Sequence, residues 1–126
     1  MQLLAIAAGG ALGAMLRYGV SSGMHAWLGR SFPYGTLAVN VIGSLLIGLL
    51  YVTFNERLAL GPHWRALLLV GLLGAFTTFS TFSIETLEFL EQGHILTAAL
   101  NVLLNVTLCI MAAWIGVLMA RAVYPV

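Results

Sequence analysis

The chain has 126 residues, of which 61% are hydrophobic and 7% charged, and its formal net charge is +1. Soluble domains carry about 25% charged residues, so there are too few charges here to cover a water-exposed globule. The composition therefore predicts an integral membrane protein whose surface is in contact with membrane lipid. Five basic residues form no basic stripe, so nucleic acid is excluded as a partner.

The first predicted element is a transmembrane helix over 3–28, which ends before the loop residue Gly29. No basic residue precedes its apolar stretch, and the stretch is long enough to cross a bilayer. We therefore expect no cleavable signal peptide. A second transmembrane helix is predicted over 34–54, and it ends before the polar residue Asn55.

The third predicted helix covers 64–90, which is longer than a bilayer requires. Gly74 in its middle is followed by five hydroxyl side chains within seven residues. Glycine and hydroxyl groups can satisfy backbone groups where a membrane helix is interrupted, so we expect a break in this helix near Gly74. The hydroxyl residues are Thr77, Thr78, Ser80, Thr81 and Ser83.

The fourth predicted helix covers 94–123 and completes a single membrane domain. The predicted fold class is an all-α membrane protein with four transmembrane helices, about the number that this length allows. Both termini then lie on the same side as three arginines, with only Arg30 opposite, a weak bias compatible with insertion in both orientations. Close helix packing is predicted at small residues of the first two helices, namely Gly9, Gly10, Gly13, Ala14, Gly43 and Gly48.

Asn40 is an amide within the apolar second helix, and a buried amide needs hydrogen-bond partners. Its NH2 group could donate to an anion. Alternatively, the side chain could link helices by hydrogen bonds, which is the commoner use of asparagine in a membrane. The residue by itself leaves both interpretations open.

Phe79 and Phe82 lie three residues apart and therefore share a helix face, beside the hydroxyls of Ser80 and Ser83. A phenyl ring has a positive edge, so a small desolvated anion could rest against both rings while hydroxyls and an amide donate hydrogen bonds to it. The alternative is core packing, with the serine hydroxyls bonded back to helix carbonyls. Composition alone does not decide between the two.

Arg17 lies about fourteen residues into the first predicted span, and Glu85 is the deepest of the glutamates at the end of the third. An unpaired charge in hydrocarbon is costly, so each must face protein, water or the membrane interface. Snorkelling to the headgroups is one of two explanations for Arg17, and a solvated helix end is the ordinary explanation for Glu85. The alternative for both is a place in the vestibule of an ion path.

The chain lacks the equipment for conventional enzyme catalysis. Its histidines, His25, His63 and His94, lie near predicted helix ends without the spacing of metal ligands, so neither a zinc site nor a catalytic base is expected. Cys109 is the only cysteine, which excludes an intramolecular disulfide. A nucleophile elbow and a phosphate-binding loop are also missing from the sequence.

Two motifs and the first helix resemble the bacterial fluoride channel family called Fluc or CrcB. The motifs are GTLAVN at 35–40 and GLLGAFTTFSTFS at 71–83, and the first helix contributes LGAMLR at 12–17. The length and the number of spans also agree with this family. The resemblance therefore extends over the whole chain.

The resemblance implies an antiparallel, dual-topology homodimer in the bacterial inner membrane, with two pathways that export fluoride passively and reduce its toxicity. It implies that Phe79 and Phe82 contact fluoride through their ring edges and that Asn40 is the amide donor. It also implies a structural Na⁺ ion at the dimer centre, bound by backbone carbonyls of Gly74 and Thr77. Weaker candidates for the polar lining are Ser80, Thr81, Ser83 and Thr36.

The chain departs from this family pattern at two places. Ala75 follows Gly74 where many members have a second glycine, and Asn101 aligns with a tyrosine of some members, so the lining from the fourth helix, including Asn105, is undefined. Two other functions remain open, a small multidrug-type cation exporter and a non-transporting scaffold subunit. An exporter needs a membrane-embedded acid, and the first two predicted helices contain none.

Overall fold

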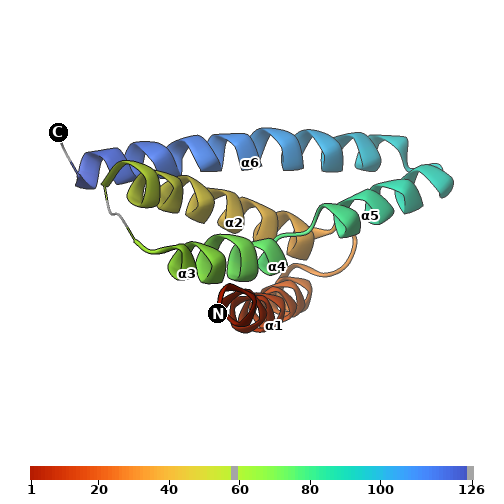
Figure 1. Cartoon of the computed structure of the whole chain (residues 1–126). Helices are drawn as coiled ribbons and strands as arrows, with labels where there is room; N and C mark the ends of the chain where they lie inside the picture. The colour runs from red at the N-terminus through yellow and green to blue at the C-terminus, as the bar shows by residue number, and fades with distance from the viewer. Residues whose placement is uncertain (58–59, 125–126) are drawn as a thin grey trace.

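The computed structural model describes residues 1–57 and 60–124, and every regular element among them is helical. Four helical stretches are long and apolar enough to cross a membrane, which confirms the predicted number. The stretches lie against one another in one bundle (Figure 1). The four stretches are Gln2–Leu28, Tyr34–Glu56, Pro62–Glu91 and Ile95–Val123.

The first two spans are joined at residues that cannot continue a helix. α1 (Gln2–Leu28) ends at Gly29, whose φ of 82° lies in the left-handed region that glycine adopts at little cost. α2 (Tyr34–Val52) starts directly after Pro33 and continues in a short π-helical segment, η1 (Thr53–Arg57). The chain thus passes from α1 to α2 within a few residues, and Figure 1 shows α1 nearly end-on while α2 runs across the view.

The third span is made of several helical pieces rather than one helix. Thr77 and Thr78 separate the last two pieces, with extended backbone angles of φ −86° and ψ 160° at Thr77 and φ −153° and ψ 115° at Thr78. Figure 1 shows this link as the thin trace that joins α4 to α5. The pieces are α3 (Pro62–Arg65), η2 (Ala66–Leu73), α4 (Gly74–Phe76) and α5 (Phe79–Glu91).

The fourth span, α6 (Ile95–Val123), is a continuous helix of 29 residues. The chain turns into it through Gly93, which has a φ of 78°. α6 runs back from the turn along α5 and then along α2 (Figure 1), so it extends on both sides of the link between α4 and α5. The link therefore lies partway along the bundle, against Asn40 of α2.

α2 and α6 approach each other closely at two reciprocal glycines. A Cβ atom at Gly48 would collide with the carbonyl of Ala113, and one at Gly116 would collide with the carbonyl of Leu45. Small residues permit such close helix contacts in membranes, where dispersion and weak Cα–H···O interactions replace the hydrophobic effect. The two helices therefore pack backbone against backbone.

α1 and η2 make a second contact of this kind. Gly9 lies against the carbonyl of Leu67, and Gly13 lies against that of Leu72. Gly43 of α2 packs closely against a side chain instead, the methyl group of Thr77 in the link between α4 and α5. These contacts confirm the close packing predicted for the glycines of the first two spans.

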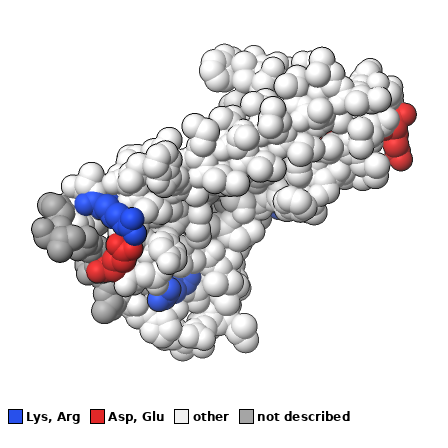
Figure 2. Space-filling view, turned by 90° about the horizontal axis from the view of Figure 1, so that it is seen from above, with Lys and Arg blue, Asp and Glu red and all other residues white. Residues whose placement is uncertain are grey.

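The outer surface of the bundle is largely apolar. Exposed large hydrophobic residues include Leu4, Ile84 and Ile110 on three different spans, and side chains of this kind face lipid in a membrane protein. Arg121 pairs with Glu56 across a distance of 2.9 Å. Figure 2 shows basic and acidic atoms side by side at one end of this face and acidic atoms at the opposite end, with an uncharged stretch between them.

Gly48→Ala is expected to destabilise the protein by about 1–3 kcal/mol, because the added methyl group meets main-chain atoms of α6 that cannot rotate away. Thermal unfolding of the purified protein in detergent measures this effect. Gly23→Ala is the matched control, since nothing lies within 4 Å of that position. Equal unfolding temperatures for Gly48→Ala and the unmodified protein would contradict the close approach.

Candidate functional site

The link between α4 and α5 is the centre of the candidate site. The hydroxyl of Thr78 accepts a hydrogen bond from the N–H of Thr81 at 3.2 Å and donates to the Thr81 hydroxyl at 2.9 Å. A threonine in this position satisfies one of the free N–H groups at the start of a helix. Thr78 therefore allows α5 to begin inside the bundle.

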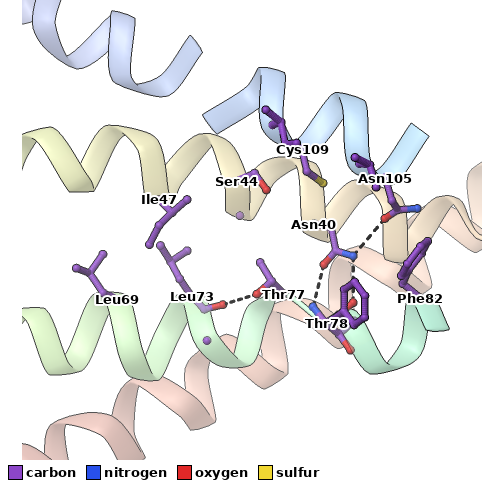
Figure 3. Close-up of a pocket in the computed structure, with 15 residues that line it drawn as sticks. Asn40, Ser44, Ile47, Leu69, Leu73, Thr77, Thr78, Phe82, Asn105 and Cys109 are labelled. Carbon is purple, nitrogen blue, oxygen red and sulfur yellow. Dashed lines mark hydrogen bonds between the residues drawn. The ribbon is translucent and has the colours of Figure 1, made fainter. Parts of the chain in front are cut away.

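Asn40 of α2 holds the link from the side. Its Oδ1 accepts from the N–H of Thr78 at 2.8 Å, and its Nδ2 donates to the carbonyl of Thr78 at 3.0 Å. In a continuous helix the Thr78 N–H would instead donate to the carbonyl of Gly74. The amide of Asn40 thus replaces hydrogen bonds that the helix gives up, as the dashed lines in Figure 3 show.

Three further side chains extend the hydrogen bonds of Asn40 across α6 to α5. Asn40 Nδ2 also donates to Asn105 Oδ1 at 3.3 Å, and Asn105 Nδ2 donates to Asn101 Oδ1 at 3.0 Å. Asn101 Nδ2 donates to Thr86 Oγ1 at 2.9 Å. The Thr86 hydroxyl donates to the carbonyl of Phe82 at 2.8 Å. We call Asn40, Asn105, Asn101 and Thr86 the amide network.

The amide network gives Asn40 the helix-linking role that the sequence left as one of two alternatives. Both N–H groups of its amide point to protein acceptors, the Thr78 carbonyl and Asn105 Oδ1. The sequence placed Asn101 and Asn105 on the fourth span without a defined role. Their i, i+4 spacing was the only available signal, because two amides at this spacing lie on the same helix face.

Phe79 and Phe82 share one face of α5, as their spacing predicts. Their ring centroids are 5.3 Å apart and the ring planes are tilted by 57°. Phe82 is 8% exposed and lies inside the bundle, whereas Phe79 is 77% exposed. The two rings therefore form one aromatic wall with an inner and an outer member.

A cavity of about 450 Å³ opens beside the link, between α2, the third span and α6. Five residues that the family resemblance assigns to the fluoride or sodium sites line it: Asn40, Gly74, Thr77, Phe79 and Phe82. The polar lining also includes three residues that sequence reasoning missed or left undefined, Ser44, Asn105 and Cys109. Figure 3 shows that these side chains come from different helices and meet around the same space.

The hydroxyl groups of the third span turn mainly to the backbone. The Thr77 hydroxyl donates to a carbonyl one turn earlier at 3.0 Å, and the Ser83 hydroxyl donates to the Phe79 carbonyl at 2.9 Å. Ser80 and Ser83 line a second, more open hollow on the outer side of Phe79. Among the described residues, neither serine nor Thr81 lines the main cavity.

Thr36 and Glu85 lie together, away from the main cavity. The Thr36 hydroxyl interacts with the carboxylate of Glu85, and His25 is near enough to interact with it electrostatically. Within residues 1–57 and 60–124, one oxygen of Glu85 and Nδ1 of His25 are buried without a hydrogen-bond partner. In the same part of the chain Arg17 is partly exposed, and it does not line the cavity.

Gly74 and Thr77 are suited to hold a small cation through main-chain oxygen. Both residues line the cavity, and the Thr78 N–H that would bond the Gly74 carbonyl in a helix donates to Asn40 instead. Hard cations prefer oxygen ligands of this type. In the described part of the chain, His, Cys, Asp and Glu side chains form no cluster of three or more that could bind a metal ion.

Comparison with known proteins gives the same family along nearly the whole chain. The family model described as CrcB-like protein, Camphor Resistance (CrcB), matches residues 4–117. Curated relatives named fluoride-specific ion channel FluC come from Methylococcus capsulatus, Coxiella burnetii and Magnetococcus marinus. They are 57%, 53% and 50% identical to this chain over 96%, 96% and 98% of its length.

The chain spans 53% of the length of the Methylococcus relative, and 98% and 100% of the Coxiella and Magnetococcus relatives. The name of these relatives describes an ion channel and not an enzyme, as the sequence predicts for this chain. The matched region contains all the residues that line the cavity. The chain therefore belongs to the CrcB-like family.

Proposed function

We propose that this protein is a fluoride-selective ion channel that exports fluoride passively across the bacterial inner membrane and so reduces its toxicity. The name of its relatives supports fluoride as the conducted ion. The structural observation that carries the proposal is one cavity at the link between α4 and α5, lined by Asn40, Phe79 and Phe82. Four apolar spans place this cavity in a multi-pass membrane protein.

The chemistry of the cavity suits a small, strongly hydrated anion. Such an ion enters a narrow space only where several donors replace its water at once. Phe79 and Phe82 offer positive ring edges. Asn40 donates to Asn105 over 3.3 Å, which is longer than either of the two hydrogen bonds between Asn40 and Thr78. The Asn40 N–H that donates to Asn105 is therefore the one that we expect to turn to the ion.

The proposed channel is an antiparallel homodimer with a structural Na⁺ ion at its centre. Phe79 is 77% exposed although its ring lines the cavity, an arrangement that suits a ring shared with a second copy of the chain. Gly74 is also exposed, so its carbonyl is accessible to an ion held jointly with Thr77 and the same residues of the second copy. Membrane lipid covers the remaining apolar faces.

Purified protein in liposomes is expected to release fluoride much faster than empty vesicles, while chloride release stays near the background rate. A fluoride electrode measures the first rate and a chloride electrode the second. Fluoride release equal to that of empty vesicles would eliminate the proposed function and leave the scaffold alternative. Proton-coupled uptake of an organic cation in the same vesicles would instead support the exporter.

Phe79→Ile and Phe82→Ile are each expected to lower fluoride efflux at least about tenfold, which corresponds to roughly 1.4 kcal/mol of the conduction barrier. An aliphatic side chain keeps the apolar contact but lacks the positive ring edge. Phe89→Ile, on the same helix but outside the cavity, is the control and should conduct like the unmodified protein. Unchanged efflux in both cavity variants would refute the ring contact.

A further inference from the structure

The amide network joins α5 to α6 where apolar packing is thin. Phe82 is the one buried residue among the 13 of α5. Within a single chain, a helix with one buried side chain makes little apolar contact with the neighbouring helices. The hydrogen bond that Asn101 of α6 donates to the Thr86 hydroxyl therefore contributes a large share of what joins α5 to α6 within one chain.

Asn105, Asn101 and Thr86 each accept one hydrogen bond from the preceding member of the amide network and donate onward. Asn101, which is 0% exposed, accepts from Asn105 at 3.0 Å and donates to Thr86 at 2.9 Å. Moving either helix would leave an unpaired amide in apolar surroundings, which is unfavourable. A buried network with these partners therefore favours a single spacing of α5 and α6.

The amide network is joined to the lining of the cavity on both α6 and α5. Asn105 lines the cavity from α6, and Phe82 lines it from α5. Thr86 donates to the carbonyl of Phe82 at 2.8 Å, so it is joined to the residue that carries the inner ring. Among the described residues, Asn101 and Thr86 do not line the cavity themselves.

We propose that Asn101 and Thr86 are positioning residues that set the gap between Phe82 and Asn105 and thereby the discrimination of fluoride from chloride. This inference rests on the proposed function. Neither residue touches the conducted ion. A gap fitted to the smaller halide rejects the larger one, and a loosened gap admits both. The hydrogen bond between Asn101 and Thr86 therefore controls selectivity from outside the ion path.

Four variants and one control test this role. Asn101→Leu and Thr86→Val each remove one side of the hydrogen bond at nearly constant volume, and the double variant removes both. Thr86→Ser keeps the hydroxyl and is the conservative rescue. Thr107→Val is the matched control, because Thr107 is an exposed threonine of α6 whose hydroxyl donates only to the Leu103 carbonyl at 2.7 Å.

The first readout is the ratio of fluoride to chloride efflux from liposomes. Asn101→Leu and Thr86→Val are expected to lower this ratio by roughly three- to thirtyfold, the range of coupling energies carried by such networks. The double variant should have a fluoride-to-chloride ratio no lower than that of the stronger single variant, since both changes break the hydrogen bond between Asn101 and Thr86. Thr86→Ser and Thr107→Val should keep the original ratio.

The second readout does not depend on fluoride conduction. Cys109 is the only cysteine of the chain and lines the cavity one helical turn from Asn105, so its rate of reaction with a small methanethiosulfonate reagent reports the shape of the cavity. Asn101→Leu and Thr86→Val are expected to change this rate, while Thr107→Val leaves it unchanged. A change shared by all variants would instead indicate general loosening and would overturn the inference.

The two readouts separate failure of this inference from failure of the proposed function. An unmodified protein that conducts no fluoride overturns the channel, and the Cys109 rate then decides whether the amide network shapes the cavity. A conducting protein in which Asn101→Leu matches Thr107→Val in both readouts overturns the positioning role. Additive effects of Asn101→Leu and Thr86→Val would also overturn it. If Asn101→Leu does not fold, the same two readouts are compared between Thr86→Val and Thr86→Ser. Equal values in these two variants would overturn the positioning role.

Discussion

The two hydrogen bonds between the side chain of Asn40 and the backbone of Thr78 are the interaction on which the site depends. A helix that stops within a bilayer leaves N–H and C=O groups where no water can bond them. Asn40 supplies an acceptor and a donor to Thr78, and the Thr78 hydroxyl caps the helix that follows. The restart of the helix places Phe79 and Phe82 in its first turns, beside the cavity that the link leaves open.

The cavity contains no charged side chain among the described residues that line it. An ion inside it would therefore meet dipoles of amides, hydroxyls, ring edges and main-chain groups. Neutral groups can hold an ion without binding it so tightly that it cannot leave, which is what conduction requires. The charged residues Arg17 and Glu85 do not line this cavity.

Much of the fold is predictable from the sequence because composition and turn residues act locally. Apolar length predicts four spans, and Gly29 and Gly93 mark two of the turns. The partners of Asn40 are not predictable in this way, because Thr78 is 38 residues away and Asn105 is 65 residues away. Helical periodicity shows which face a side chain occupies, but the packing of whole helices decides which amide it meets.

The surroundings of the hydroxyl residues near the site are also not predictable from the sequence alone. The sequence shows a run of hydroxyl residues after Gly74, yet it does not show which of them face the cavity. In the structure Thr77 lines the cavity, whereas Ser80 and Ser83 face an outer hollow. The dimer, the sodium ion and the individual fluoride contacts stay predictions, since each involves a partner beyond a single chain.

The reciprocal glycines of α2 and α6 limit how this sequence can evolve. Gly48 and Gly116 each face a main-chain carbonyl of the other helix, so neither neighbour can shrink to make room for a larger residue. A core leucine can be exchanged when a second side chain compensates for the change in volume. At this seam no compensating replacement exists, and a larger residue at either glycine requires the two helices to move apart.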